Sequence, residues 1–214
     1  MRPIIIDIDL ATVDDNGIFE NQTLGGAGDV SLDGVEIVSG EWITPDGFAK
    51  KIGIASAGDV NTVTFTITGY SDPDKHNLIT DTITGVNANT VESTKYFYSI
   101  TSIAADAAVG TNIFGGAVDE AVTQAIPLNW RGGVTTVNLD ITGTMDITIQ
   151  NTFDNIQNLN DLDFNWQDSP ASSLTNATAS TNDAYDGLPR GLRLKVNSYS
   201  TGAECKFIIQ QRDV

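Results

Sequence analysis

Short segments in which apolar and polar residues strictly alternate recur along the chain, and they constrain its fold more than any other feature. The clearest examples are residues 63–67, 137–141 and 145–149. Successive side chains of a β-strand point to opposite faces of a sheet, so alternation predicts strands that bury one face. Similar patterns cover residues 4–10, 34–38, 77–84, 95–103, 190–198 and 204–210. The sequence therefore predicts an all-β chain of about a dozen strands.

Turn-forming residues separate the alternating segments. Glycine follows asparagine or aspartate at Asn16-Gly17, Asp33-Gly34 and Asp46-Gly47, which supplies the positive φ that tight connections need. Strong helix formers are scarce, and the one helix candidate, residues 117–125, is about two turns long. We therefore expect antiparallel β-sandwich or jelly-roll-like domains with minimal helix.

Two glycine pairs, Gly115-Gly116 and Gly132-Gly133, frame a segment that has strand patterns on both sides. Domain boundaries often fall in such segments, and the 214 residues are enough for two small β domains. The predicted division is a β domain over residues 1–116, a linker over residues 117–133 and a β-sandwich domain over residues 134–214.

Two further segments carry specific expectations. Residues 161–190 are rich in Ser, Thr, Asn and Ala, which predicts a long polar loop between two strands. Residues 1–10 form an alternating strand that has two interpretations. It is either an arm that adds to the sheet of a neighbouring subunit, or a strand that completes a sandwich of its own chain.

Charge and cysteine content exclude several classes of partner and site. The chain has 11 Lys and Arg against 28 Asp and Glu, a net charge of −17, so most of its surface repels nucleic acid. No segment approaches the roughly 20 apolar residues that cross a bilayer, and we expect no membrane partner. The apolar start is too short for a secretory signal, which favours synthesis in a cytoplasm. Cys205 is the single cysteine, so no internal disulfide can form.

Catalytic and metal-binding patterns are weak throughout the sequence. His76 is the only histidine and lies in a turn-rich stretch, which argues against a two-histidine metal site or a Ser-His-Asp triad. Asp161 and Asp163 could share one strand face as a carboxylate pair, but acidic residues are so abundant that such pairs arise by chance. We expect no enzymatic activity, no cofactor and no metal.

The best candidates for an interaction surface are basic, aromatic and apolar. Residues 132–189 contain eight acidic and no basic residues, whereas Arg190, Arg193 and Lys195 begin a basic C-terminal segment. These basic residues either pair with acidic neighbours of their own domain or contact an acidic partner subunit. Trp166 could contribute to an interface or stack on a sugar, and Trp130 could pack into a core or an interface. Ile4, Ile6 and Ile8 are the interface candidates of the first strand.

Several segments resemble virion proteins of tailed bacteriophages. Residues 63–69 and 82–103 look like a module that is common in such proteins. The stretches at residues 126–130, 145–155, 164–166 and 188–196 resemble a small β protein encoded among phage structural genes. Asn155 stands where that protein usually has a second aspartate, which argues against a required ion there.

The resemblance implies a structural role in the virion and no catalytic residue. Its leading implication is a capsid-decoration or cement protein, a homo-oligomer on the virion exterior that binds the major capsid protein or other virion subunits. One alternative is an accessory subunit of the neck or tail. Another is a glycan-binding adhesin module in which Trp166 contacts a host glycan.

Overall fold

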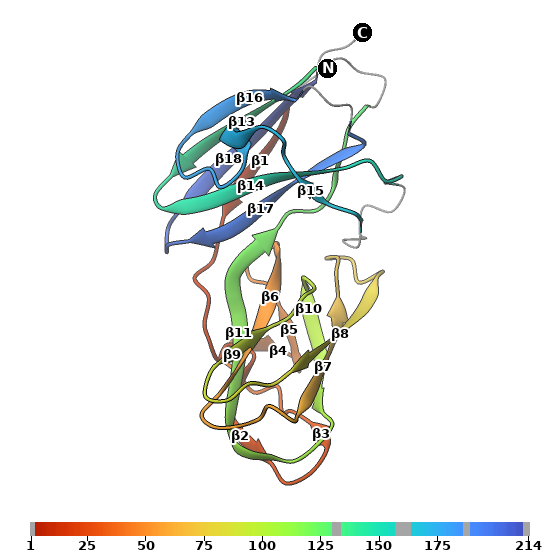
Figure 1. The fold of residues 1–214 in the computed structure, drawn as a ribbon, viewed down its shortest axis with the longest axis vertical. Coiled ribbons are helices and arrows are strands. Elements are labelled where there is room, and N and C mark those ends of the chain that lie inside the picture. The colour runs from red at the N-terminus through yellow and green to blue at the C-terminus, as the bar shows by residue number, and fades with distance from the viewer. Residues whose placement is uncertain (1–2, 130–133, 157–163, 186–188, 212–214) are drawn as a thin grey trace. The chain divides into compact units, whose positions relative to one another are not determined.

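The structure, a computed structural model, describes residues 3–129, 134–156, 164–185 and 189–211 (Figure 1). Over these residues the chain forms eighteen β-strands and one three-residue 3₁₀-helix, η1 (Ser172–Leu174). The paired strands are antiparallel, so the predicted all-β fold with minimal helix is confirmed. No helix in this part of the chain is long and apolar enough to cross a membrane.

The chain divides into two compact units. Residues 1–12 and 120–214 form one unit, called here the terminal unit, and residues 13–119 form the other, the middle unit. The division falls inside strand β11 (Val109–Val122), between Asp119 and Glu120. Strand β11 contributes to sheet pairing in both units, and buried apolar residues form a core in each.

The terminal unit consists of two antiparallel sheets. The first has the order β1 (Ile4–Asp9), β18 (Glu204–Gln211), β13 (Thr135–Thr142) and β16 (Thr181–Tyr185). The second has the order β15 (Gln167–Asp168), β14 (Met145–Thr152) and β17 (Gly191–Tyr199), and β17 pairs in turn with β12 (Ile126–Pro127) and the last residues of β11. Their core includes Ile8, Leu139, Ile149, Leu194 and Phe207, each at most 2% exposed.

The middle unit is built in the same way. One sheet has the order β4 (Ile37–Val38), β5 (Glu41–Ile43), β10 (Ser99–Ala105), β7 (Thr64–Tyr70) and β8 (Leu78–Thr84), with β3 (Gly28–Asp29) paired to β10. The other contains β2 (Phe19–Leu24), β11, β6 (Ala49–Ser56) and β9 (Thr90–Glu92). Trp42, Phe65 and Phe97 lie in its core with no exposed surface.

The expected helix over residues 117–125 is wrong, and so is the linker that was to contain it. Residues 117–122 continue β11, and its last two residues, Ala121 and Val122, pair with β17, so a neighbouring strand supplies backbone hydrogen bonds there that a two-turn helix would have to provide alone. The preceding glycines mark close packing inside the strand. A Cβ on Gly116 would lie 1.8 Å from the carbonyl oxygen of Asp14, and one on Gly115 would lie 2.2 Å from the ring of Phe19.

The structure also corrects the assignment of two other segments. Residues 4–9 pair with β18 of the same chain in six residue pairs, so this strand belongs with residues 120–214 instead of a domain over 1–116. The predicted loop over 161–190 contains β15, η1 and β16. Strand β16 escaped prediction because Thr181–Tyr185 is almost entirely polar, and only Tyr185 is buried.

Candidate functional site

Arg190 and Lys195, which flank the first half of β17, both make contacts within the terminal unit. The exposed Arg190 donates a hydrogen bond from Nη1 to Asn155 Oδ1 over 3.1 Å. Lys195 Nζ lies 3.4 Å from Glu120 Oε1. Lys195 therefore pairs with an acidic neighbour of its own domain, as the first of the two alternatives predicts.

Arg193 lies inside the terminal unit and is only 5% exposed. Its Nε donates to Gln150 Oε1 over 2.8 Å, and Gln150 Nε2 donates to Asp168 Oδ1 over 2.8 Å. The guanidinium carbon lies 4.5 Å from the ring centre of Trp166. The strand register thus places Arg193 of β17, Gln150 of β14 and Asp168 of β15 side by side across the sheet. The expectation that Arg193 contacts a partner is corrected, because almost none of its side chain is accessible.

Trp166 is half-buried, and its aromatic faces already have neighbours. Phe164 meets it edge to face, with ring centres 6.0 Å apart and planes at 78°. Arg193 lies over one face, so that face is closed to a sugar. The Nε1 of Trp166 is buried and has no hydrogen-bond partner among the described residues. Trp130 lies outside the described residues, and a glycan role for Trp166 stays a prediction.

Ile4, Ile6 and Ile8 of β1 face the core of the terminal unit, whereas Ile5 points outward and is 53% exposed. Ile4, Ile6 and Ile8 stand opposite Ile209, Phe207 and Cys205 of β18, respectively. Ile8 is 2% exposed, whereas Ile4 and Ile6 are half-buried because β1 is the last strand of its sheet. These side chains therefore contribute to the core of the terminal unit, and the backbone of β1 on the side away from β18 remains accessible.

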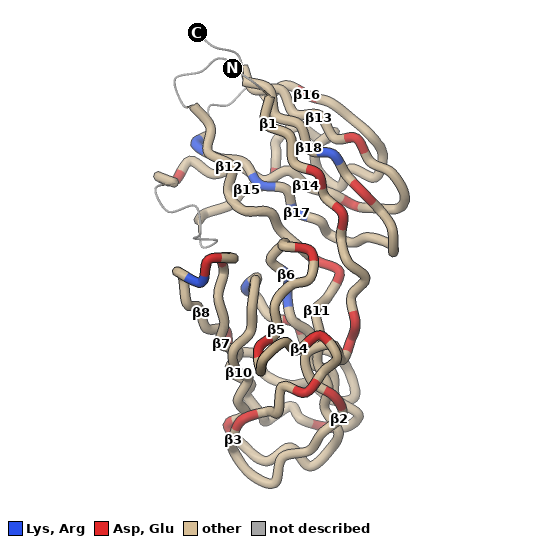
Figure 2. Tube along the Cα trace, turned by 180° about the vertical axis from the view of Figure 1, so that it is seen from behind, with Lys and Arg blue, Asp and Glu red and all other residues tan. Residues whose placement is uncertain are grey.

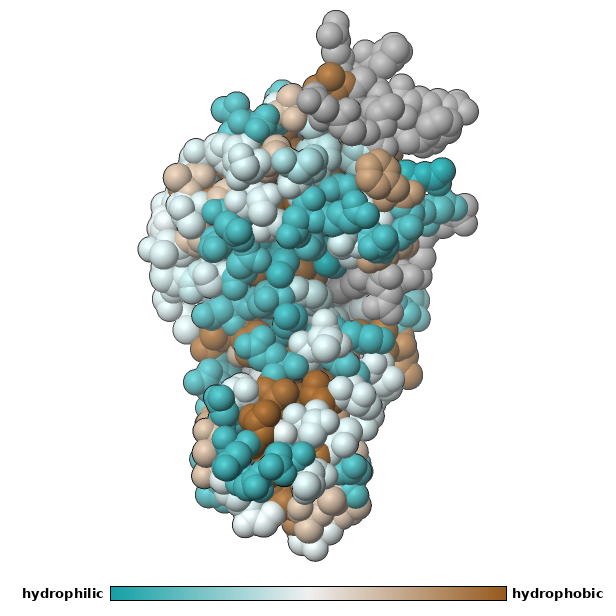
Figure 3. All heavy atoms as spheres, in the orientation of Figure 1, coloured by the Kyte–Doolittle hydropathy of each residue, from teal (hydrophilic) through white to brown (hydrophobic). Residues whose placement is uncertain are grey.

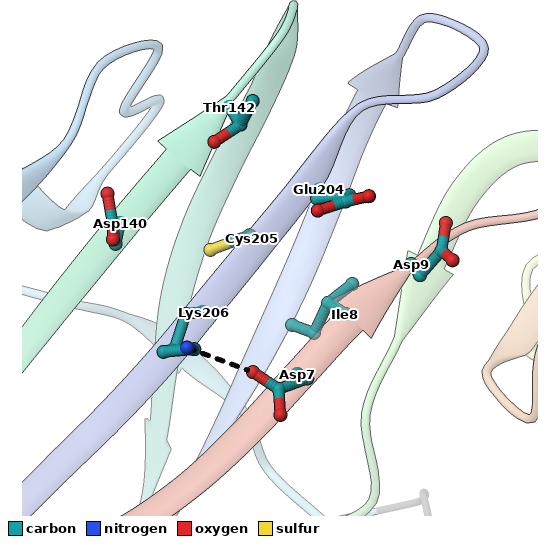
Figure 4. Close-up of a pocket in the computed structure, with 8 residues that line it drawn as sticks. All are labelled: Asp7, Ile8, Asp9, Asp140, Thr142, Glu204, Cys205 and Lys206. Carbon is teal, nitrogen blue, oxygen red and sulfur yellow. Dashed lines mark ion pairs between the residues drawn. The ribbon is translucent and has the colours of Figure 1, made fainter.

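The opposite, solvent-facing side of β1, β18 and β13 carries a polar hollow of about 300 Å³ (Figure 4). Alternation places these side chains together, since every second residue of each strand points outward. Asp7 and Asp140 both stand opposite Lys206, and Asp9 stands opposite Glu204. The hollow is lined by Asp7, Ile8, Asp9, Asp140, Thr142, Glu204, Cys205 and Lys206.

Negative charge dominates this hollow. Four carboxylates line it against the single ammonium of Lys206, whose Nζ lies 3.7 Å from Asp7 Oδ1. Asp9 and Glu204 are direct cross-strand neighbours of like charge, an arrangement that destabilises a sheet unless a cation lies nearby. Figure 2 shows acidic residues on these strands of the terminal unit. A cationic group next to Asp9 would relieve this repulsion.

Cys205 contributes little chemistry to the hollow. It belongs to the buried face of β18, together with Phe207 and Ile209, and it is 2% exposed. Burial raises the pKa of its thiol from 9.0 to about 12, so the thiol stays protonated at neutral pH. A nucleophilic role for this thiol is therefore disfavoured.

The remaining catalytic and metal candidates do not form a cluster in the described part of the chain. The His76 side chain is 69% exposed, and its Nδ1 lies 3.9 Å from Asp72 Oδ1. No group of three or more His, Cys, Asp or Glu residues that could hold a metal occurs among the described residues. Asp161 and Asp163 lie outside those residues.

Comparison with known proteins adds no relative. No model of a known protein family matches the chain, and no curated protein sequence is significantly similar to it.

Sequence reasoning missed the acidic members of the hollow. Asp7 and Asp9 alternate with isoleucines, so their outward direction could have been predicted. Their grouping with Asp140 and Glu204 could not, because it requires the order β1-β18-β13, which joins the two ends of the chain.

Proposed function

We propose that this chain is a non-enzymatic structural subunit of a tailed-bacteriophage virion, a decoration or cement protein on the outside of the head shell. The observation that carries the proposal is the construction of each unit as an antiparallel β-sandwich around its own apolar core. Such sandwiches are rigid without disulfides and can present fixed surfaces to a lattice of neighbours. The sequence resemblance to virion proteins points in the same direction.

Surface charge supports an exterior position. The net charge of −17 keeps a subunit soluble at high copy number and prevents it from binding the packaged genome. Most side chains on the face of the molecule in Figure 3 are hydrophilic or neutral in hydropathy. Weak contacts between such a subunit and the shell become strong when symmetry repeats them.

The partners in this proposal are the major capsid protein or other virion subunits, and the subunit acts as a homo-oligomer. An accessory subunit of the neck or tail would use the same rigid scaffold in a ring of fewer copies. The two positions differ in copy number and in location on the particle, so one experiment separates them.

The test is electron microscopy of intact particles labelled with an antibody against this chain. We expect label over the whole head and, on a gel of purified particles, a band comparable to that of the major capsid protein. Label confined to the neck or tail would replace the decoration role with the accessory role. Unlabelled particles, with a control antibody against the capsid protein still binding, would overturn the virion proposal.

A further inference from the structure

Strand β1 forms a free edge of its sheet. It lies at one end of the order β1-β18-β13-β16, and its six residues pair on one side with β18. Within the described residues, no strand pairs with the other side of β1. The backbone groups on that side can bond to an additional strand, as exposed sheet edges do in general.

The other long sheet edges of the molecule carry protective features that β1 lacks. Strands β8 and β16 each place a carboxylate, Asp81 and Asp183, on the face that otherwise points to the core. The pKa of Asp183 is lowered by hydrogen bonds from Ser173 Oγ and the Ala184 backbone, which favours the charged form at this edge. An inward charge of this kind discourages strand addition.

The edge of β2 is protected in a different way. The Gln22 side chain accepts a hydrogen bond from Ser31 N–H and donates one to Ser31 C=O, both over 2.9 Å. Glu20 N–H donates to Asp33 Oδ1 over 2.9 Å. The strands β4, β9 and β15, which end the other sheet paths, are only two or three residues long. Strand β1 is therefore the long edge that has neither an inward charge nor side chains bonded across it.

The side chains of β1 specify what an added strand must carry. On the core side, the half-buried Ile4 and Ile6 leave apolar surface that an aliphatic neighbour would cover. On the outer side, Asp7 and Ile5 are 78% and 53% exposed, and Asp9 repels Glu204. Basic side chains on an added strand would pair with both aspartates, as Lys206 already does with Asp7 from the β18 side.

Charge argues against a second copy of this strand as the occupant. Two antiparallel β1 strands would bring Asp7 and Asp9 of both copies onto one face, where the four carboxylates would repel one another. We propose that the β1 edge accepts, by strand addition, an extended segment of another virion subunit in which aliphatic residues alternate with lysine or arginine. The identification of the partner as a virion subunit depends on the proposed function, whereas the edge chemistry does not.

Binding of a model strand to the full chain tests this inference. The probe is a fluorescein-labelled hexapeptide that alternates lysine and valine, and the control peptide has the same composition with its three lysines adjacent. We expect fluorescence anisotropy to show at least about tenfold tighter binding of the alternating peptide. Hydrogen–deuterium exchange should show new protection at residues 4–9 when this peptide binds. Equal binding of the two peptides, or protection elsewhere, would overturn the proposal.

Charge variants show whether the peptide binds at the β1 edge or elsewhere on the acidic face. Asp7→Lys/Asp9→Lys should weaken binding of the alternating peptide at least about tenfold, while Asp140→Lys, two strands away, should change it less than about threefold. Equal losses would mean that the face attracts cations without strand addition, and the proposal would fail. If the reversal variant does not fold, Asp7→Asn/Asp9→Asn replaces it, with a smaller loss expected in the same direction.

The peptide assay and the particle-labelling experiment fail independently. Loss of peptide specificity with label still on the particle would reject only the edge inference. Specific peptide binding with no label on the particle would reject only the virion role.

Discussion

The two units bury charge in different ways. In the middle unit, the buried charges include carboxylates, and Asp46 forms an ion pair with Lys50 over 2.8 Å while both side chains are at most 2% exposed. Asp72, which has no exposed surface, accepts backbone N–H groups of His76 and Asn77. In the terminal unit, the buried polar groups include the amides Gln150, Asn151 and Gln211 and the guanidinium of Arg193.

This difference affects how much each unit is destabilised when a buried polar or charged residue is substituted. A buried carboxylate left without its cation keeps a full desolvation penalty, whereas a neutral amide that loses one hydrogen bond keeps a smaller one. In the middle unit, carboxylates also fix loops, because Asp81 accepts the N–H groups of Thr94 and Lys95 over 2.6 and 3.0 Å. Substitutions of buried charged residues should therefore destabilise the middle unit more than the terminal unit.

The largest effect is expected for Lys50→Met. The change removes the cation that pairs with the buried Asp46 carboxylate and should lower the free energy of unfolding by about 3–5 kcal/mol, although Thr44 Oγ1 and Phe48 N–H still donate to that carboxylate. Urea unfolding followed by tryptophan fluorescence and circular dichroism measures this loss. The matched control is Lys51→Met, since Lys51 is half-buried and its Nζ lies 5.7 Å from the ring centre of Tyr96.

The control should cost less than about 1 kcal/mol. The double variant Lys50→Met/Asp46→Asn should recover part of the loss, since it neutralises the charge left behind. A loss for Lys50→Met no larger than the control's would show that the middle unit does not depend on this ion pair.

A smaller effect is expected for Arg193→Met in the terminal unit. The variant loses the hydrogen bond to the neutral Gln150 and the contact with the Trp166 ring, which together are worth about 2–4 kcal/mol. The same unfolding experiment measures it, and the fluorescence of Trp166 should change in the folded state. If this loss exceeds that of Lys50→Met, the contrast between the units is reversed. Lys195→Met, at a half-buried ion pair, is the control.

The sequence predicts the strands of both units far better than their connections. In β7 and β13, the alternating residues are buried and exposed as the pattern requires, with Phe65, Ile67 and Val137 at 0% exposure. The glycines of β11 misled the prediction, because a glycine that allows close packing looks identical in sequence to one in a linker.

The candidate site was less accessible to prediction. In the sequence, Arg193 looks like a surface residue. It is buried because the strand register places it opposite Gln150 and because Trp166 lies against its guanidinium group. Strand β1 was correctly predicted as a strand, but its partner β18 lies almost 200 residues away, at 204–211. Pairing over such a separation depends on the closure of the whole unit, which local patterns do not encode.

The last expected effect is confined to alkaline pH and concerns a buried thiol and a buried phenol that stay protonated in the folded chain. Burial raises the pKa of Cys205 to about 12 in the terminal unit, and burial with the charges of Asp46 and Asp72 raises the pKa of Tyr98 in the middle unit. Above pH 9 the unfolded thiol ionises while the folded thiol holds its proton, so the unfolded state binds fewer protons and stability falls as pH rises toward 12. Cys205→Val should flatten this decline for the terminal unit and leave the contribution of Tyr98 unchanged. Urea unfolding at pH 8, 9.5 and 11, compared between the variant and the natural chain, measures the difference. Parallel declines in the two proteins would show that the thiol is not held protonated by the fold.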